Sequence, residues 1–181
     1  MSHGEKEFIA ALEGCGALRF GDFTLASGAK SNYYIDIKRA STDPRVLELM
    51  AGGMAALMER EGLRPDRIAG VVLGSVPLAT ALSLRTGIPF LMVRKESKDH
   101  GTRSLIEGTF SRGEDVLVVE DVVTSAGSLV DAVGRLRDAG LDVSTAISAI
   151  DREAGGSERL AADGVKLHSL LRASSIPGVG K

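Results

Sequence analysis

The 181-residue chain alternates short apolar, β-branched runs with segments of helical periodicity, and this alternation limits its fold more than any other feature. The runs are nearly continuous in apolar residues, which is typical of strands buried on both faces. Helical segments between such strands indicate parallel pairing with crossover connections. We therefore expect a doubly wound α/β fold with a mainly parallel sheet. The expected strands are 68–73, 89–93, 116–119 and 143–150, with 165–171 as a candidate fifth, and the expected helices between them are 78–85 and 129–139.

An N-terminal elaboration precedes this core. Asp43-Pro44 suits a helix start, since Asp caps the first N–H groups and Pro has the helical φ. No internal repeat or low-complexity linker interrupts the chain, so we expect one domain over residues 1–181, with an N-terminal hood of about 1–40 and a core of about 41–181. The further elements expected are a helix over 5–14, an extended, turn-rich segment over 20–38 with a strand near 33–35, and a helix over 44–61.

Composition excludes several classes of function. A net charge of −2, 4% aromatic residues and no Trp argue against a nucleic-acid or membrane-surface partner. Cys15 is the only cysteine, which rules out an intrachain disulfide and a cysteine-based zinc site. The N-terminus has no apolar signal core, and no apolar run reaches membrane-spanning length. We expect a soluble, cytoplasmic protein.

The stretch DVLVVEDVVTSAGS, residues 115–128, carries the strongest indication of chemistry. An apolar run meets Glu120 and Asp121, and a loop of small and hydroxyl residues follows before a helix. In open α/β sheets ligands bind at the carboxyl ends of strands, and a loop at a helix start offers N–H groups to phosphate. The acids would repel that phosphate and suit a neighbouring polyol or metal-bound group. A phosphorylated ribose fits both halves, whereas an ordinary strand and helix would leave two buried acids without partners.

The same stretch resembles the phosphoribosyl-diphosphate (PRPP) signature of the type I phosphoribosyltransferases. The resemblance implies that the acid pair holds the ribose 2′ and 3′ hydroxyls and that the loop wraps the 5′-phosphate. The residues implied to bind PRPP here are Glu120, Asp121, Val122, Val123, Thr124, Ser125, Ala126, Gly127 and Ser128.

A second block lies between the strands at 89–93 and 116–119, in an interval too long for an ordinary connection. Within it, residues 104–110 suggest a β-hairpin arm that turns near Glu107-Gly108. The start of the interval is rich in cations that could surround a pyrophosphate, although Glu96 and Asp99 interleave with them as in an ordinary solvated loop. Its basic residues are Arg94, Lys95, Lys98, His100 and Arg103.

The segment RKESKDHG, residues 94–101, resembles the long flexible catalytic loop of the orotate phosphoribosyltransferases, which purine-type relatives lack. The resemblance implies that Arg94, Lys95, Lys98 and His100 handle the diphosphate. It also implies a homodimer in which Lys95, Lys98 and His100 act on the neighbouring subunit's site.

Three further blocks extend this resemblance. FTLASGAKSNYYID, residues 23–36, resembles the hood over the base, with Ala26 and Ala29 where the family often has Lys and Arg. Residues 73–79 fall where the family places a diphosphate-binding loop, without the Lys that some members carry there. Arg152 matches the residue that engages orotate, and a guanidinium suits its carboxylate. Thr124 is implied to lie near the orotate.

The resemblance implies an orotate phosphoribosyltransferase of pyrimidine biosynthesis, with orotate and PRPP as substrates. It implies Lys98, His100 and Asp121 as catalytic residues and Mg²⁺ held mainly by substrate oxygens rather than by the protein. Two alternatives stay open. A transferase for another base would have no use for Arg152, and a PRPP-binding regulator usually carries an added DNA-binding element, which we do not find. P-loop and dinucleotide enzymes are excluded, since neither GxxxxGKS nor GxGxxG occurs.

Overall fold

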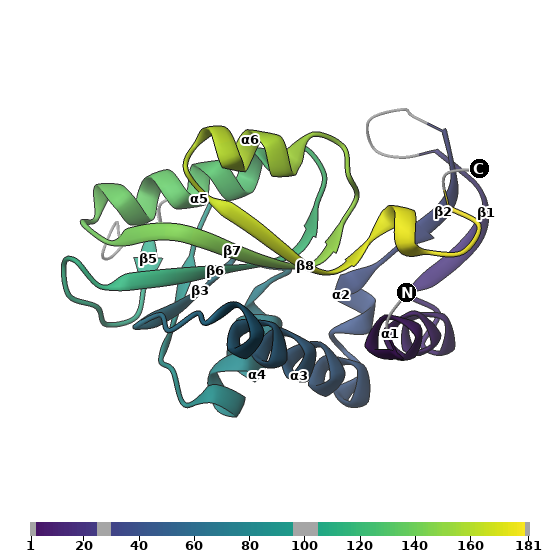
Figure 1. The fold of residues 1–181 in the computed structure, drawn as a ribbon, viewed down its shortest axis with the longest axis horizontal. Coiled ribbons are helices and arrows are strands. Elements are labelled where there is room, and N and C mark those ends of the chain that lie inside the picture. The colour runs from purple at the N-terminus through teal and green to yellow at the C-terminus, as the bar shows by residue number, and fades with distance from the viewer. Residues whose placement is uncertain (1–2, 25–29, 96–104, 180–181) are drawn as a thin grey trace.

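The computed structural model describes residues 3–24, 30–95 and 105–179, and its centre is a six-stranded sheet with helices on both faces (Figure 1). The strand order is β5-β4-β3-β6-β7-β8. All neighbouring strands are parallel except β5, which runs antiparallel to β4. The predicted doubly wound, mainly parallel α/β fold is thus confirmed. The strands are β3 (Arg67–Val71), β4 (Phe90–Val93), β5 (Ile106–Glu107), β6 (Asp115–Val123), β7 (Asp142–Asp151) and β8 (Lys166–Arg172).

Two helices cover each face of the sheet. Helices α3 (Pro44–Glu61) and α4 (Val76–Thr86) lie on one face, and α5 (Gly127–Asp138) and α6 (Gly156–Ala162) lie on the other (Figure 1). Each face therefore has its own apolar core, and burying a Leu- or Met-sized side chain in it contributes about 1.5–3 kcal/mol. The largest fully buried side chains include Met50, Met54, Leu78 and Leu82 on the first face and Leu129 and Leu136 on the second.

Helix α3 begins and ends as its sequence predicts. The Asp43 carboxylate accepts hydrogen bonds from the N–H groups of Arg45 and Val46, and Pro44 occupies the first turn. The helix stops at Gly62, whose φ of 68° is the left-handed conformation that glycine adopts without strain. Its methionines Met50, Met54 and Met58 are buried in the core.

The N-terminal segment forms a layer at one end of the sheet (Figure 1). It consists of α1 (His3–Gly14), an antiparallel hairpin of β1 (Leu18–Thr24) and β2 (Lys30–Ile35), and the short helix α2 (Ile37–Ala40). Tyr33 and Ile35 are buried and belong to the same core cluster as α3. Near the other end of the chain, the Gly178 carbonyl accepts a hydrogen bond from the Asn32 amide, which ties residues 176–179 to the hairpin.

Some boundaries differ from prediction. The strand expected over 68–73 already ends at Val71, because residues 72–75 turn into α4; the Val72–Leu73 peptide in this turn is cis. Strand β6 continues through the acid pair to Val123 instead of stopping before it. The β-hairpin arm expected over 104–110 is wrong for residues 105–110, since β5 pairs with β4. Helix α6 is an addition, too short to show a clear periodicity in the sequence.

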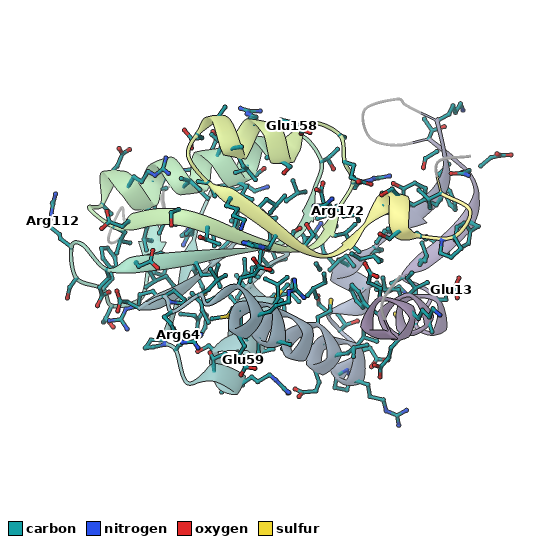
Figure 2. The ribbon with its side chains drawn as sticks, in the orientation of Figure 1. Glu13, Glu59, Arg64, Arg112, Glu158 and Arg172 are labelled. Carbon is teal, nitrogen blue, oxygen red and sulfur yellow. The ribbon has the colours of Figure 1, made fainter. Side chains whose placement is uncertain are left out.

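Charged side chains point outward around the molecule, as Glu59, Arg112 and Glu158 do in Figure 2. Within the described ranges, no helix is both long and apolar enough to cross a membrane.

Candidate functional site

Strand order opens a crevice between the carboxyl ends of β3 and β6. The chain leaves β3 towards β4 on one side and leaves β6 towards β7 on the other, so the loops after these two neighbouring strands diverge. Such a switch point is where open α/β sheets bind ligands. Gly70 of β3 pairs with Val119 of β6, and β3 ends one residue later while β6 runs on beside β7. Glu120 is therefore level with Val71, the last residue of β3, and Asp121 lies beyond it, next to the loop of residues 72–75.

Glu120 is a buried acid with two donors on one oxygen. Its side chain is enclosed, with the residue only 8% exposed, and its Oε1 accepts hydrogen bonds from Ser75 Oγ at 2.5 Å and from the Asp121 N–H at 3.0 Å. Burial, aided by a hydrogen bond to the Asp121 carboxyl and by that group's charge, raises the pKa of Glu120 to about 8, against the opposing effect of Ser75. The carboxyl of Glu120 is therefore mostly protonated near neutral pH when no ligand is bound.

Asp121 is enclosed by different partners. Its Oδ1 accepts the N–H of Val122 at 2.8 Å, and its Oδ2 lies 3.9 Å from Lys38 Nζ. Gly74 approaches so closely that a Cβ on it would lie 2.2 Å from Oδ2. These contacts show how the fold accommodates two adjacent acids. The sequence interpretation missed Lys38 and the hydroxyl of Ser75; a serine at a strand end before a helix was the one visible signal.

The loop after β6 forms a pocket of about 290 Å³. Ala126 has a left-handed φ of 57° and places no side-chain oxygen on the first turn of α5, which starts at Gly127. The N–H groups of that turn therefore remain for a ligand, and the positive end of the helix dipole favours an anion. The pocket is lined by Glu120, Val122, Val123, Thr124, Ser125, Ala126, Gly127, Ser128 and Leu129.

The start of α6 supports this loop from behind. A Cβ on the buried Gly156 would lie 2.5 Å from the Thr124 carbonyl oxygen and 2.6 Å from Val123 Cγ1, so the two segments touch backbone to backbone. Arg159 also donates a hydrogen bond to the Ser125 carbonyl at 3.4 Å.

A second pocket, of about 140 Å³, adjoins the first, and the two share Glu120, Val122 and Ser128. The second pocket brings together the acid pair, the loop after β3 and two cations. Its lining residues are Lys38, Val71, Val72, Leu73, Gly74, Lys95, Glu120, Asp121, Val122 and Ser128.

Arg152 lies directly after β7, beside the end of β6. Its N–H donates to the Val123 carbonyl at 2.9 Å, and its guanidinium lies over the Tyr33 ring, 5.0 Å from the ring centre. The N-terminal hairpin therefore packs against the residue expected to bind orotate. Thr124, the other residue expected there, is the next residue after Val123 and lines the pocket of the loop.

Arg94 and Lys95, the two basic residues of the long interval that the structure describes, have different surroundings. Lys95 lines the pocket that holds the acid pair of its own chain, and its expected role at the neighbouring subunit's site stays a prediction. Arg94 instead pairs with Glu107 at 3.6 Å and is absent from the linings of both pockets. Arg135 of α5 donates hydrogen bonds to the carbonyls of Arg94 and Lys95, both at 3.0 Å, which fixes where the interval begins.

Several expected residues lie outside the described ranges. They are Lys98 and His100 of the cationic segment, its Arg103, and Ala26 and Ala29 of the hood.

The acid pair also bears on metal binding. Among the described residues, no group of three or more His, Cys, Asp or Glu side chains could enclose a cation. The crevice offers two adjacent carboxyl groups, one of them mostly protonated. This donor set fits Mg²⁺ that takes most of its oxygen ligands from a substrate.

Comparisons with known proteins agree with this geometry. The family model of the phosphoribosyl transferase domain matches residues 42–167, which include both pocket loops. An orotate phosphoribosyltransferase of Methanosarcina mazei is 50% identical over 172 residues, covering 95% of this chain and 91% of the relative.

Solved structures point the same way. Orotate phosphoribosyltransferase from Aeropyrum pernix superposes with a TM-score of 0.84 at 35% identity, covering 93% of this chain and 94% of that one. The Mycobacterium tuberculosis enzyme in complex with PRPP gives a TM-score of 0.78 at 31% identity, over 94% and 97% of the two chains. The crevice, the family model and relatives matched over nearly their whole length lead to one conclusion: this chain belongs to the orotate phosphoribosyltransferase family.

Proposed function

We propose that this protein transfers the phosphoribosyl group of PRPP to orotate, giving orotidine 5′-monophosphate and pyrophosphate in pyrimidine biosynthesis. The observation that carries the proposal is the pair of adjoining pockets at the β3–β6 switch point, one suited to a phosphate and the other lined by acids and cations. The PRPP complex of the related M. tuberculosis enzyme supports it.

PRPP binds along β6 and the loop that follows it. Thr124 to Ser128 hold the 5′-phosphate through N–H groups and hydroxyls at the start of α5. Glu120 and Asp121 orient the ribose through its 2′ and 3′ hydroxyls. Val122 and Val123 form the backbone between these two groups, and their strand pairing with β7 keeps the acids and the loop at a constant separation.

The diphosphate extends into the pocket that Lys95 lines. Lys98 and His100 complete its neutralisation from the neighbouring subunit of a homodimer. Arg94 pairs with Glu107 and lines neither pocket of its own chain, so we assign it to the partner's diphosphate as well. Mg²⁺ held mainly by substrate, beside Glu120 and Asp121, would supply charge neutralisation for the leaving group.

The reaction is a displacement at C1 of the ribose. The bond from C1 to the diphosphate oxygen breaks with its electron pair, the bond from orotate N1 to C1 forms, and the N1 proton is released. Positive charge develops on the ribose, as in glycoside hydrolysis. Asp121, Lys98 and His100 are the catalytic residues: the first faces the developing positive charge, and the other two hold the departing pyrophosphate. No covalent intermediate with the protein is required, since alignment and electrostatics suffice.

Orotate binds between Thr124 and Arg152, with its carboxylate on the guanidinium. The stacking on Tyr33 holds that guanidinium plane in one orientation, and bidentate recognition of a carboxylate depends on such orientation. The positive guanidinium of Arg152 favours orotate, which carries a carboxylate, over an uncharged base or a purine.

Two wider predictions accompany this function. The N-terminal segment shares a core cluster with α3 and the sheet, which supports one domain over residues 1–181. The single cysteine suits a reducing compartment, and a cytoplasmic location stays a prediction.

A test of the function follows orotate's ultraviolet absorbance after PRPP and Mg²⁺ are added. The wild-type protein should consume orotate, and uracil or adenine should not replace it. Arg152→Ala should raise the KM for orotate by roughly 10-fold or more, because a charge-assisted pair is lost, while the KM for PRPP stays within about twofold. Arg64→Ala, at an exposed position far from the crevice, is the control. Equal losses for both substrates would argue against the carboxylate role, and no turnover by the wild type would refute the function.

A further inference from the structure

Lys38 has no role in the site as described so far, yet its position is well determined. It lies on α2, which Ile37 and Ala40 anchor in the core with at most 2% exposure. The Asp36 carboxylate caps this helix by accepting the Arg39 N–H at 3.1 Å. The backbone of Lys38 is therefore held in place, while its side chain reaches the second pocket and the Asp121 carboxylate.

A diphosphate in the second pocket would need a cation close to the acid pair. A diphosphate bound beside Glu120 and Asp121 would meet like charge unless basic groups stood between or around them. Among the described residues that line this pocket, the basic ones are Lys38 and Lys95. Lys95 belongs to the cationic interval after β4, so it approaches from one side. Lys38 comes from the N-terminal segment and approaches from the loop after β3.

Gly74 of the loop after β3 leaves no space for a cationic side chain at its own position. A Cβ on Gly74 would lie 2.2 Å from Asp121 Oδ2, so any side chain at this position would displace the acid. The same Cβ would lie 3.3 Å from Lys38 Cε, which means that the Lys38 side chain passes directly over the glycine. The space beside Gly74 is thus shared by the Asp121 carboxylate and the side chain of Lys38.

We propose that Lys38 binds the diphosphate group of PRPP and the pyrophosphate product. Its side chain reaches them over Gly74, which has no side chain of its own. This inference rests on the proposed function and adds a substrate-binding residue to it. Without ligand, the ammonium lies near Asp121; when the diphosphate enters, the ammonium contacts a phosphate oxygen and Asp121 turns to the ribose. Because α2 directly follows β2, which carries Tyr33 against Arg152, the hairpin then connects the orotate and diphosphate ends of the site.

The test separates the diphosphate from the rest of the substrate. Calorimetry would measure the Kd of pyrophosphate and of ribose 5-phosphate, each with Mg²⁺, for the wild type, Lys38→Ala, Lys38→Arg and Lys166→Ala. Lys166 is a matched control, because its side chain is 70% exposed and lies 3.7 Å from Glu61, against 69% and 3.9 Å for Lys38 and Asp121. Removing it changes the net charge equally, far from the crevice.

We expect Lys38→Ala to weaken pyrophosphate binding by about 10-fold or more, as for one lost charge-assisted contact, and to leave ribose 5-phosphate within about twofold. Lys38→Arg should restore most of the affinity, and Lys166→Ala should match the wild type. Equal weakening of both ligands would show that Lys38 acts only through Asp121 and would overturn the proposal, as would unchanged pyrophosphate binding. These measurements require no turnover, so a wild type that binds both ligands but leaves orotate unchanged would refute the proposed function alone.

Discussion

The buried acid of the crevice should make the stability of the unliganded protein depend on pH in a particular direction. The pKa of Glu120 is raised from 4.5 to about 8 in the folded chain, chiefly by burial. The folded state therefore binds the proton more tightly than the unfolded state does. The resulting stabilisation is complete below pH 4.5 and is lost as the pH rises towards 8.

Glu120→Gln removes this dependence while preserving the shape of the site. A glutamine oxygen can still accept the hydrogen bonds from Ser75 and the Asp121 N–H, and its amide can donate where the protonated acid would. One proton of difference changes the free energy of unfolding by about 1.4 kcal/mol per pH unit. Between pH 4.5 and 8 the wild type should lose roughly 3–5 kcal/mol relative to the variant.

The assay is urea unfolding of both proteins at half-unit steps from pH 5 to 8. Comparing the two proteins cancels the other titrating groups, which they share. Glu59→Gln, an exposed carboxylate on α3, serves as the control and should run nearly parallel to the wild type. If the stability difference between wild type and Glu120→Gln is constant across this range, the assignment of a protonated Glu120 is wrong.

Two further predictions concern the support of the substrate loops. Gly156→Ala should weaken PRPP binding by about 10-fold and cost about 1–3 kcal/mol of stability, because its Cβ would meet the loop backbone at 2.5 Å. The control is Gly134→Ala within α5, where no atom lies within 4 Å of the added Cβ; it should stabilise the protein by up to about 1 kcal/mol. Calorimetry would measure PRPP binding and thermal melting would measure stability, and equal effects of the two substitutions would contradict the packing argument. Arg135→Ala removes two hydrogen bonds at 3.0 Å to the carbonyls that follow β4, so the KM for PRPP should rise severalfold with little change in orotate affinity; an unchanged KM would show that these bonds do not position the cationic segment.

Local patterns in the sequence were enough to predict much of the fold. The Asp43-Pro44 start of α3, the apolar strands and the helix after the small-residue loop all follow from interactions within a few residues. The same holds for the phosphate half of the site, because a strand, a loop and a helix start occur there in unbroken succession. Resemblance to a family added Arg152, whose backbone N–H the structure places against the Val123 carbonyl at the end of β6.

Boundaries were less predictable where neighbouring strands differ in length. Apolar residues continue past Val71, so composition alone extends β3 by two residues. The adjoining β6 has a partner in β7 for its full length, which lets the acid pair remain within the strand. The pocket that Lys95 lines was not predictable from local sequence either, since Arg135 of a distant helix holds the Lys95 carbonyl after β4.

The sequence by itself determined the kind and order of most elements and the motif suited to a sugar phosphate, since each arises from contiguous residues. Only the tertiary structure decided that β3 would lie beside β6. That neighbourhood lets Ser75 donate a hydrogen bond to Glu120, leaves no space for a side chain between Gly74 and Asp121, and brings Lys38 to Asp121. These contacts join residues far apart in the chain, and their distances are set by strand pairing and packing on both faces of the sheet. Helix and strand propensities depend on neighbouring residues and do not specify distances between residues far apart in the chain. The paired strands of the folded sheet do specify them.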